Sequence, residues 1–190
     1  MRLFFAVLLP EALIERVVEA QRGLRALVGD DGVRWTRTDQ FHYTLKFLGE
    51  QPTPRAYQAV EAASAVCAAR LPFRLALGGV GAFPGAERPS VLWLGATEGA
   101  EELVDLARAL DGALARQRFP RENRPPRAHL TLARVRSYAG ETAAARAVPS
   151  ARADDVGSMT VDGIALMQST MRASDSQYTL VERFRFAAGE

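Results

Sequence analysis

Cysteine and lysine are almost absent from this sequence, and long apolar runs are absent altogether. Cys67 is the single cysteine, so an internal disulfide is excluded, and its alanine-rich surroundings predict a small core residue. Lys46 is the single lysine, and arginine supplies the rest of the positive charge. No apolar run is long enough to span a bilayer, so we expect no membrane partner and a cytoplasmic protein.

The apolar segment near the N-terminus, residues 3–9, is too short for a signal peptide. Pro10 and Glu11 follow it instead of a small-residue cleavage site, which favours a buried first strand. The 190 residues are 48% hydrophobic and 24% charged, as in an ordinary globular protein. We therefore expect residues 1–190 to form a single two-lobed domain, and a monomer.

The formal net charge is only +2, but arginines gather in the stretch 116–136, where Glu122 alone opposes them. Its members are Arg116, Arg118, Arg121, Arg124, Arg127, Arg134 and Arg136. For any one of them a solvated surface position is the alternative. Together they predict a surface that attracts phosphate groups.

Helix and strand patterns alternate along the chain. Apolar residues at helical spacing predict helices over residues 10–28, 52–70 and 100–116, with a shorter one within 137–152. Strand patterns fall at residues 2–9, 33–35, 41–48, 73–83, 91–94, 128–135, 158–167 and 177–186. The last two are expected to pair with each other. This order predicts an α/β fold.

One short motif occurs twice. His42-Tyr43-Thr44-Leu45 returns as His129-Leu130-Thr131-Leu132, and these are the only two histidines of the chain. Each copy lies on a predicted strand that follows a strand–helix stretch. The chain is therefore predicted to consist of two similar halves related by a pseudo-twofold axis.

Strand geometry gives this motif a chemical meaning. Side chains alternate between the faces of a strand, so each copy presents one imidazole and one hydroxyl on the same face. One neutral and one charged imidazole suit proton transfer to and from a phosphodiester near neutral pH. The hydroxyls of Thr44 and Thr131 can stabilise the charge that builds on the phosphate oxygens.

A strained cyclic phosphate needs no metal for this reaction. His42 and His129 also lack a neighbouring Cys, Asp or Glu at ligand spacing, although a site with one metal ion on the two histidines is an alternative. A merely structural role for both histidines is a second alternative. No glycine-rich phosphate-binding motif is present, so no nucleotide cofactor is expected.

At the two motifs the chain resembles the two-histidine phosphoesterase superfamily, and more closely the bacterial and archaeal RNA 2′,3′-cyclic phosphodiesterases, also called 2′-5′ RNA ligases. The similarity extends over nearly the whole chain. The matching segments are residues 3–7, Trp35, residues 42–49, 91–95 and 129–134, Gln168, Ser169 and Tyr178. One departure is Ala128, which stands where the family usually has proline.

The resemblance implies two antiparallel sheets that form a V-shaped cleft, with helices outside. It implies metal-independent hydrolysis of RNA 2′,3′-cyclic phosphate ends to 2′-phosphates, with 2′-5′ ligation as the reverse reaction. The substrate would be RNA with such an end, tRNA fragments included. The same resemblance makes His129 the proton acceptor and His42 the proton donor, and it places Arg134 at the phosphate.

For four further side chains the sequence leaves the orientation or the role undecided. Strict alternation turns Arg134 away from His129, so its phosphate role requires a bend in the strand. Lys46 is expected on the face of His42, as a rim contact or a solvated side chain. Trp35 and Phe83 could stack a base or belong to the core.

Two other functions remain as alternatives. The same site could act on a small cyclic nucleotide, or the protein could bind nucleotides or RNA without turnover.

Overall fold

The computed structural model describes residues 1–172 and 175–188. Its helices are α1 (Glu11–Val28), α2 (Thr53–Ala68), α3 (Ala100–Arg116) and α4 (Tyr138–Ala147), with short 3₁₀ turns η1 (Thr38–Gln40) and η2 (Val148–Ser150). Its strands are β1 (Arg2–Leu8), β2 (Val33–Trp35), β3 (His42–Glu50), β4 (Phe73–Phe83), β5 (Val91–Glu98), β6 (Leu130–Val135), β7 (Gly157–Val161), β8 (Gly163–Arg172) and β9 (Asp175–Arg185).

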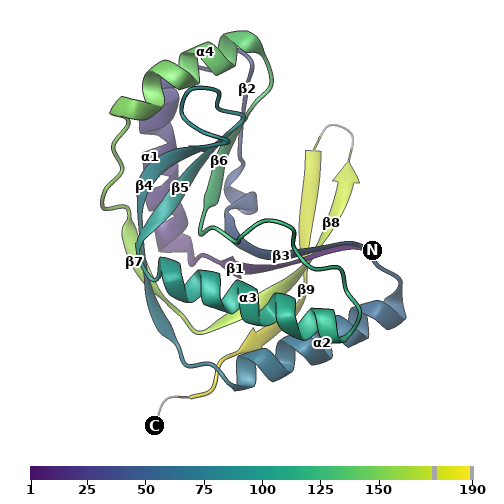
Figure 1. Ribbon diagram of the computed structural model, residues 1–190. Coiled ribbons are helices and arrows are strands. Elements are labelled where there is room, and N and C mark those ends of the chain that lie inside the picture. Colours follow the sequence, from purple (N-terminus) through teal and green to yellow (C-terminus); the bar gives the residue numbers. More distant parts are fainter. Residues whose placement is uncertain (173–174, 189–190) are drawn as a thin grey trace.

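The strands form two antiparallel groups that meet at one point. One group has the order β7-β4-β5-β6, with β2 also paired to β6, and the other has the order β3-β1-β8-β9. A single residue pair, Tyr43 with Leu130, joins β3 to β6. The sheet is therefore continuous by pairing but divided into two lobes by shape, and Figure 1 shows the lobes diverging from this junction. The α/β fold expected from the sequence is confirmed.

Helices cover the outer faces of the lobes in a crossed arrangement. α1 follows β1 but contacts β7 and α4, whereas α3 follows β5 and contacts β3 and α2 as well as β5 (Figure 1). β1 pairs with β3 as β5 pairs with β6. The unit β1-α1-β3-α2 thus repeats as β5-α3-β6-α4, and the two copies of the histidine motif occupy equivalent strands.

The single strand expected over residues 158–167 is two strands, β7 and β8, and the expected antiparallel pairing with residues 177–186 is confirmed for β8, which pairs with β9. The chain breaks at Asp162, and the two parts join different lobes, because β7 pairs with β4 and β8 pairs with β1 and β9. Both parts are strand-like, and the sequence does not show that they separate.

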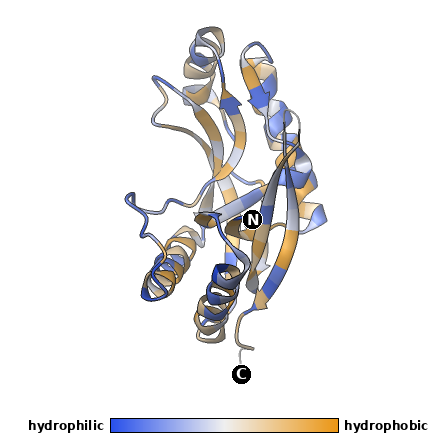
Figure 2. Cartoon of the chain, turned by 90° about the vertical axis from the view of Figure 1, so that its right-hand side faces the viewer, coloured by the Kyte–Doolittle hydropathy of each residue, from blue (hydrophilic) through white to orange (hydrophobic). Residues whose placement is uncertain are grey.

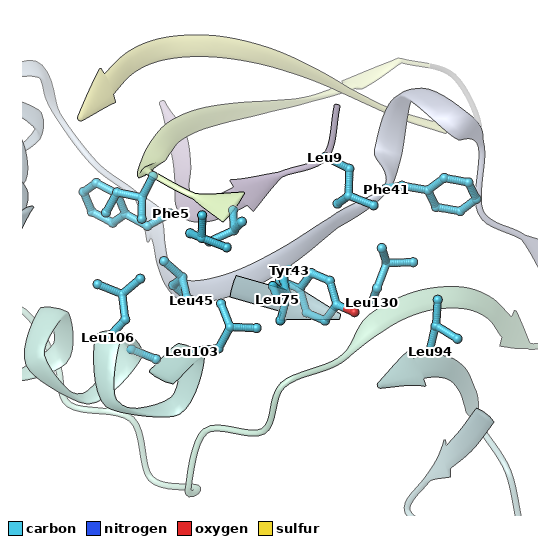
Figure 3. Packing of buried hydrophobic residues seen from close by; sticks show 14 of the residues in the cluster. Phe5, Leu9, Phe41, Tyr43, Leu45, Leu75, Leu94, Leu103, Leu106 and Leu130 are labelled. Atoms are coloured by element: carbon cyan, nitrogen blue, oxygen red, sulfur yellow. The ribbon is translucent and has the colours of Figure 1, made fainter. Parts of the chain in front are cut away.

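Buried hydrophobic side chains form one large core between the sheet and the helices. Tyr43 lies at its centre among the side chains of Leu45, Leu75 and Leu130, and its hydroxyl donates to the Gly95 carbonyl at 2.8 Å (Figure 3). Hydrophobic and hydrophilic residues alternate along several strands (Figure 2), whereas the opposite face of β1 and β8 carries a second, smaller apolar cluster of Phe4, Ala6, Ala165 and Met167. Among the described residues, no helix is long and apolar enough to cross a membrane.

Candidate active site

His42 is the first residue of β3, and its ring is held by groups two residues away on either side. Its Nδ1–H donates to the carbonyl of Gln40 at 2.7 Å, and its Nε2 lies 2.9 Å from Thr44 Oγ1. A carbonyl can only accept, so the neutral ring carries its proton on Nδ1, and Nε2 accepts from the threonine hydroxyl. The rings of Phe4 and Tyr178 lie 5.0 and 5.5 Å from the imidazole.

His129 precedes β6 and repeats this arrangement. Its Nδ1–H donates to the carbonyl of Arg127, again two residues upstream, at 2.9 Å. The ring of Phe83 lies edge-on at 4.9 Å. Both histidines are thereby fixed in the same tautomer, with a basic Nε2 left for chemistry.

The junction of the lobes brings the two motifs together. Tyr43 and Leu130 face the core, so their neighbours along each strand face the opposite side. Continuing the antiparallel register from this pair puts His42 beside Thr131 and Thr44 beside His129. Each imidazole thus lies next to the hydroxyl of the other motif, as the repeat predicts.

Desolvation controls the charge of both imidazoles. Burial lowers the pKa of His42 from 6.5 to about 4, partly offset by the hydrogen bond to Gln40, and the nearby His129 lowers it further. Burial also lowers the pKa of His129, again offset in part by its backbone hydrogen bond, while the charges of Arg134 and Arg127 add to the decrease. Both rings are therefore neutral at pH 7 in the free protein, and an anion between them would favour protonation.

A bulge in β6 accounts for the position of Arg134. Thr131 pairs with Trp93 and Ala133 with Leu92, so Leu132 is an extra residue in the ladder. One extra residue reverses the alternation, and Arg134 falls on the face of Thr131. This is the bend that a phosphate role for Arg134 requires, and its charge acts on His129.

A bulge in β3 overturns the expectation for Lys46. Ala6 pairs with Thr44 and Phe5 with Lys46, so Leu45 is the extra residue and Lys46 turns away from His42. Lys46 is 3% exposed and is neither a rim contact nor solvated.

Lys46 instead anchors the loop that leads to His129. Its Nζ donates to Asp111 Oδ1 and to the carbonyl of Pro120, both at 2.7 Å. Asp111 Oδ1 also accepts from the backbone N–H of Glu122 at 3.1 Å. These hydrogen bonds of the buried Lys46 and the partly buried Asp111 tie α3, β3 and the loop together.

Phe47, and not Lys46, lies on the face of β3 that carries His42. Its ring lies 5.8 Å from that of Phe4, on the side of His42, and Phe47 is 60% exposed. Phe47 and Arg134 each come five residues after a motif histidine, so the equivalent bulges present an aromatic ring in one lobe and a cation in the other. Sequence reasoning missed Phe47, although this shared spacing was a usable signal.

Trp35 and Phe83 differ in their relation to the site. Trp35 packs against the main core and its Nε1–H donates to Gly29 at 3.2 Å, which favours a core role. Phe83 contacts His129, Trp93 at 5.2 Å and the guanidinium of Arg127 at 5.1 Å. A Cβ at Gly81 would collide with the Trp93 ring, so the glycine at this position allows that ring to pack against the backbone of β4.

A metal centre finds no further support in the side chains. Among the described residues, no group of three or more His, Cys, Asp or Glu side chains comes together as a metal site. The polar groups next to the histidines are hydroxyls and guanidinium groups, which suit a phosphate. The two-lobed fold and the paired histidines together define a two-histidine phosphoesterase.

Comparison with known proteins gives the family. The model of the LigT-like phosphoesterase family matches residues 7–93 and again residues 94–175, one match for each half. The chain belongs to this family and is an enzyme of the phosphoesterase class.

Relatives and solved structures cover almost the whole chain. The RNA 2′,3′-cyclic phosphodiesterase of Thermus thermophilus is 33% identical over 97% of this chain and 89% of that protein. Its namesake in Methanothermobacter thermautotrophicus is 30% identical over 97% and 98%. The crystal structure of TT0787 of Thermus thermophilus has a TM-score of 0.83 at 31% identity and covers both chains fully. Escherichia coli LigT complexed with 3′-AMP has a TM-score of 0.78 at 28% identity over 97% of each chain.

Proposed function

We propose that this protein hydrolyses 2′,3′-cyclic phosphates at RNA ends to 2′-phosphates, with His42 and His129 as its acid–base pair and residues 1–190 as one catalytic domain. The observation that carries the proposal is the shared tautomer, because both Nδ1–H groups donate to backbone carbonyls and each Nε2 is left as a basic nitrogen, that of His42 beside the Thr44 hydroxyl. The names of the relatives supply the substrate class.

The reaction follows from the two nitrogen atoms. His129 Nε2 takes a proton from water as the water oxygen bonds to phosphorus. The bond from phosphorus to the ribose 3′ oxygen then breaks, and protonated His42 Nε2 donates its proton to that oxygen. The 2′-phosphate leaves, and proton exchange with solvent restores the pair.

The phosphate itself prepares the acid. Free His42 is neutral at pH 7, but an anionic phosphate beside it favours the charged ring and raises its pKa. Thr44, Thr131 and Arg134 bind the non-bridging oxygens, where negative charge increases in the transition state. No step requires a metal ion or a cofactor.

The same steps allow ligation. When the 5′-hydroxyl of a second RNA replaces water, proton transfer to His129 and from His42 yields a 2′-5′ linkage. The exposed ring of Phe47 offers a stacking surface for a base near the site.

Single-histidine variants test the proposal. His42→Ala and His129→Ala should each lower kcat on an RNA with a cyclic phosphate end by about 10²–10⁴-fold while keeping a cooperative unfolding transition. Tyr138→Ala, 83% exposed on α4, is the control and should retain full activity. A histidine variant that is folded and fully active would refute the acid–base pair.

A further inference from the structure

A cleft extends from the catalytic face of β6 across β5 and β4. The strand order β3-β6-β5-β4 places His42 at one side, His129 next to it and Trp93 beyond both. Trp93 pairs directly with Thr131, so the two side chains share one face of the sheet and their Cβ atoms lie about 5 Å apart. The cleft, of which Trp93 is part, therefore begins beside the catalytic groups and lies on the side of His129.

The cleft is large enough for a ligand of nucleoside size. Its volume is about 740 Å³, which is within the range of sites that bind small molecules. Val104 of α3 lines one wall, and residues 126–128, directly before His129, line another. Gly78, Gly79 and Gly95 belong to the floor, so much of the floor is bare backbone that a planar ligand can approach closely.

The indole ring of Trp93 lies over this floor. A Cβ at Gly81 or at Gly95 would press against its six-membered ring, so the two glycines let the ring rest on the backbone of both strands. Trp93 is only partly buried, and among the described residues its Nε1–H is the one buried side-chain polar group without a hydrogen-bond partner. The ring is thus positioned by packing, and it offers an aromatic face of the kind on which nucleobases stack.

The charged side chains around the cleft balance each other. Glu101 and Asp105 of α3 are matched by Arg108 and Arg127, and Asp105 pairs with Arg108 at 3.4 Å. The two carboxylates would repel a phosphate, whereas a nucleoside without a 5′-phosphate is uncharged and its base can donate amino hydrogens to them. The lining therefore suits the uncharged 5′-hydroxyl end of an RNA strand.

The direction of the reaction indicates which strand this is. In an in-line displacement the entering and leaving oxygens lie on opposite sides of phosphorus. In the proposed mechanism His42 protonates the leaving 3′ oxygen and His129 takes the proton of the entering oxygen, so the entering group approaches from the side of His129. Water enters there in hydrolysis, and the 5′-hydroxyl of a second RNA enters there in ligation.

We propose that this cleft binds the 5′-terminal nucleoside of a second RNA strand, with its base on Trp93 and its 5′-hydroxyl at His129 Nε2. The hydroxyl proton moves to His129 as the 5′ oxygen bonds to phosphorus. The bond from phosphorus to the 3′ oxygen breaks, and His42 donates its proton to that oxygen. This inference rests on the proposed function and assigns the cleft to ligation, since water needs no such site.

Hydrolysis and ligation consume the same cyclic phosphate, so the ratio of their products separates the cleft from the chemistry. Labelled RNA with a 2′,3′-cyclic phosphate end is incubated with an excess of a 5′-hydroxyl RNA, and both products are quantified. Val104→Trp fills the cleft from α3 and should lower the ratio of ligated to hydrolysed product about tenfold, with hydrolysis unchanged. Trp93→Leu should lower the ratio similarly, whereas Trp93→Phe keeps an aromatic face and should retain most of it.

Glu102→Trp is the matched control, because Glu102 is exposed on α3 but lies outside the cleft. It should change neither the ratio nor hydrolysis. An unchanged ratio in Val104→Trp would overturn the proposal, and slower hydrolysis of the RNA in that variant would then place the cyclic-phosphate strand itself in the cleft. The proposal would also be overturned if the unmodified protein hydrolyses the RNA but does not ligate it.

Absence of hydrolysis would instead refute the proposed function, and binding then tests the cleft alone. The chain has two tryptophans, so Trp35→Phe leaves Trp93 as the single one. A dinucleotide with a 5′-hydroxyl and no cyclic phosphate should quench the fluorescence of this protein saturably, and the same dinucleotide with a 5′-phosphate should quench it less. Equal quenching by the two dinucleotides, or none, would overturn the proposal.

Discussion

The buried imidazole of His42 makes the stability of this fold sensitive to acid. Phe4 and Tyr178 enclose the ring, and burial lowers its pKa from 6.5 to about 4. The unfolded chain, with the ordinary value, binds the proton more tightly than the folded protein does. Stability from this group is therefore fully present above pH 6.5 and is lost as the pH falls toward 4. Between pH 7 and pH 5 the loss amounts to about 2 kcal/mol.

His42→Gln removes this titration and keeps a polar side chain at the site. Urea unfolding at pH 7 and pH 5 should show that the unmodified protein loses about 2 kcal/mol more stability than the variant over this interval. His129 titrates in the same direction and stays in both proteins, so its contribution cancels in the comparison. Equal losses in both proteins would refute the desolvation of His42. Because the chain has only two histidines, ring-proton NMR of the unmodified protein gives the same pKa directly.

Three further predictions concern the surroundings of the site. Lys46→Met should lower the free energy of unfolding, measured in urea, by about 2 kcal/mol, because Asp111 and the Pro120 carbonyl lose a charged donor, while Asp111 keeps Arg121 and the backbone N–H of Glu122. An undiminished stability in Lys46→Met would contradict the anchoring role. Arg134→Ala should raise both KM for the cyclic phosphate and the NMR pKa of His129, since a nearby positive charge is removed; an unchanged pKa would argue against that proximity. Inorganic phosphate should raise the NMR pKa of both histidines, and no shift at saturating phosphate would show that the anion binds elsewhere.

The repeated motif was sufficient to predict the halves and the chemical groups of the site, because a period of two fixes which side chains share a face. That rule stops working at a bulge. Leu45 and Leu132 each insert one residue, and neither leaves a local pattern that distinguishes it from an ordinary strand residue. Lys46 was therefore placed on the wrong face, since its partner Asp111 lies 65 residues away. For Arg134, strict alternation predicted the face opposite His129, and only the family resemblance indicated the face of His129.

Topology was the other part that the sequence did not reveal. The break at Asp162 sends β7 and β8 to different lobes, although residues 157–172 are strand-like almost throughout. The crossed packing of α1 and α3 likewise depends on contacts between distant segments, which a local pattern does not encode.

Product identity tests the central claim most directly. The purified protein, with chelator present, is incubated with an RNA oligonucleotide that ends in a 2′,3′-cyclic phosphate, and the product end is identified by ³¹P NMR. The account predicts a 2′-phosphate, formed by the unmodified protein and lost in His42→Ala and His129→Ala. A 3′-phosphate would contradict the assignment of the proton donor to the 3′ oxygen. No product, with the RNA still bound, would contradict the enzyme function itself.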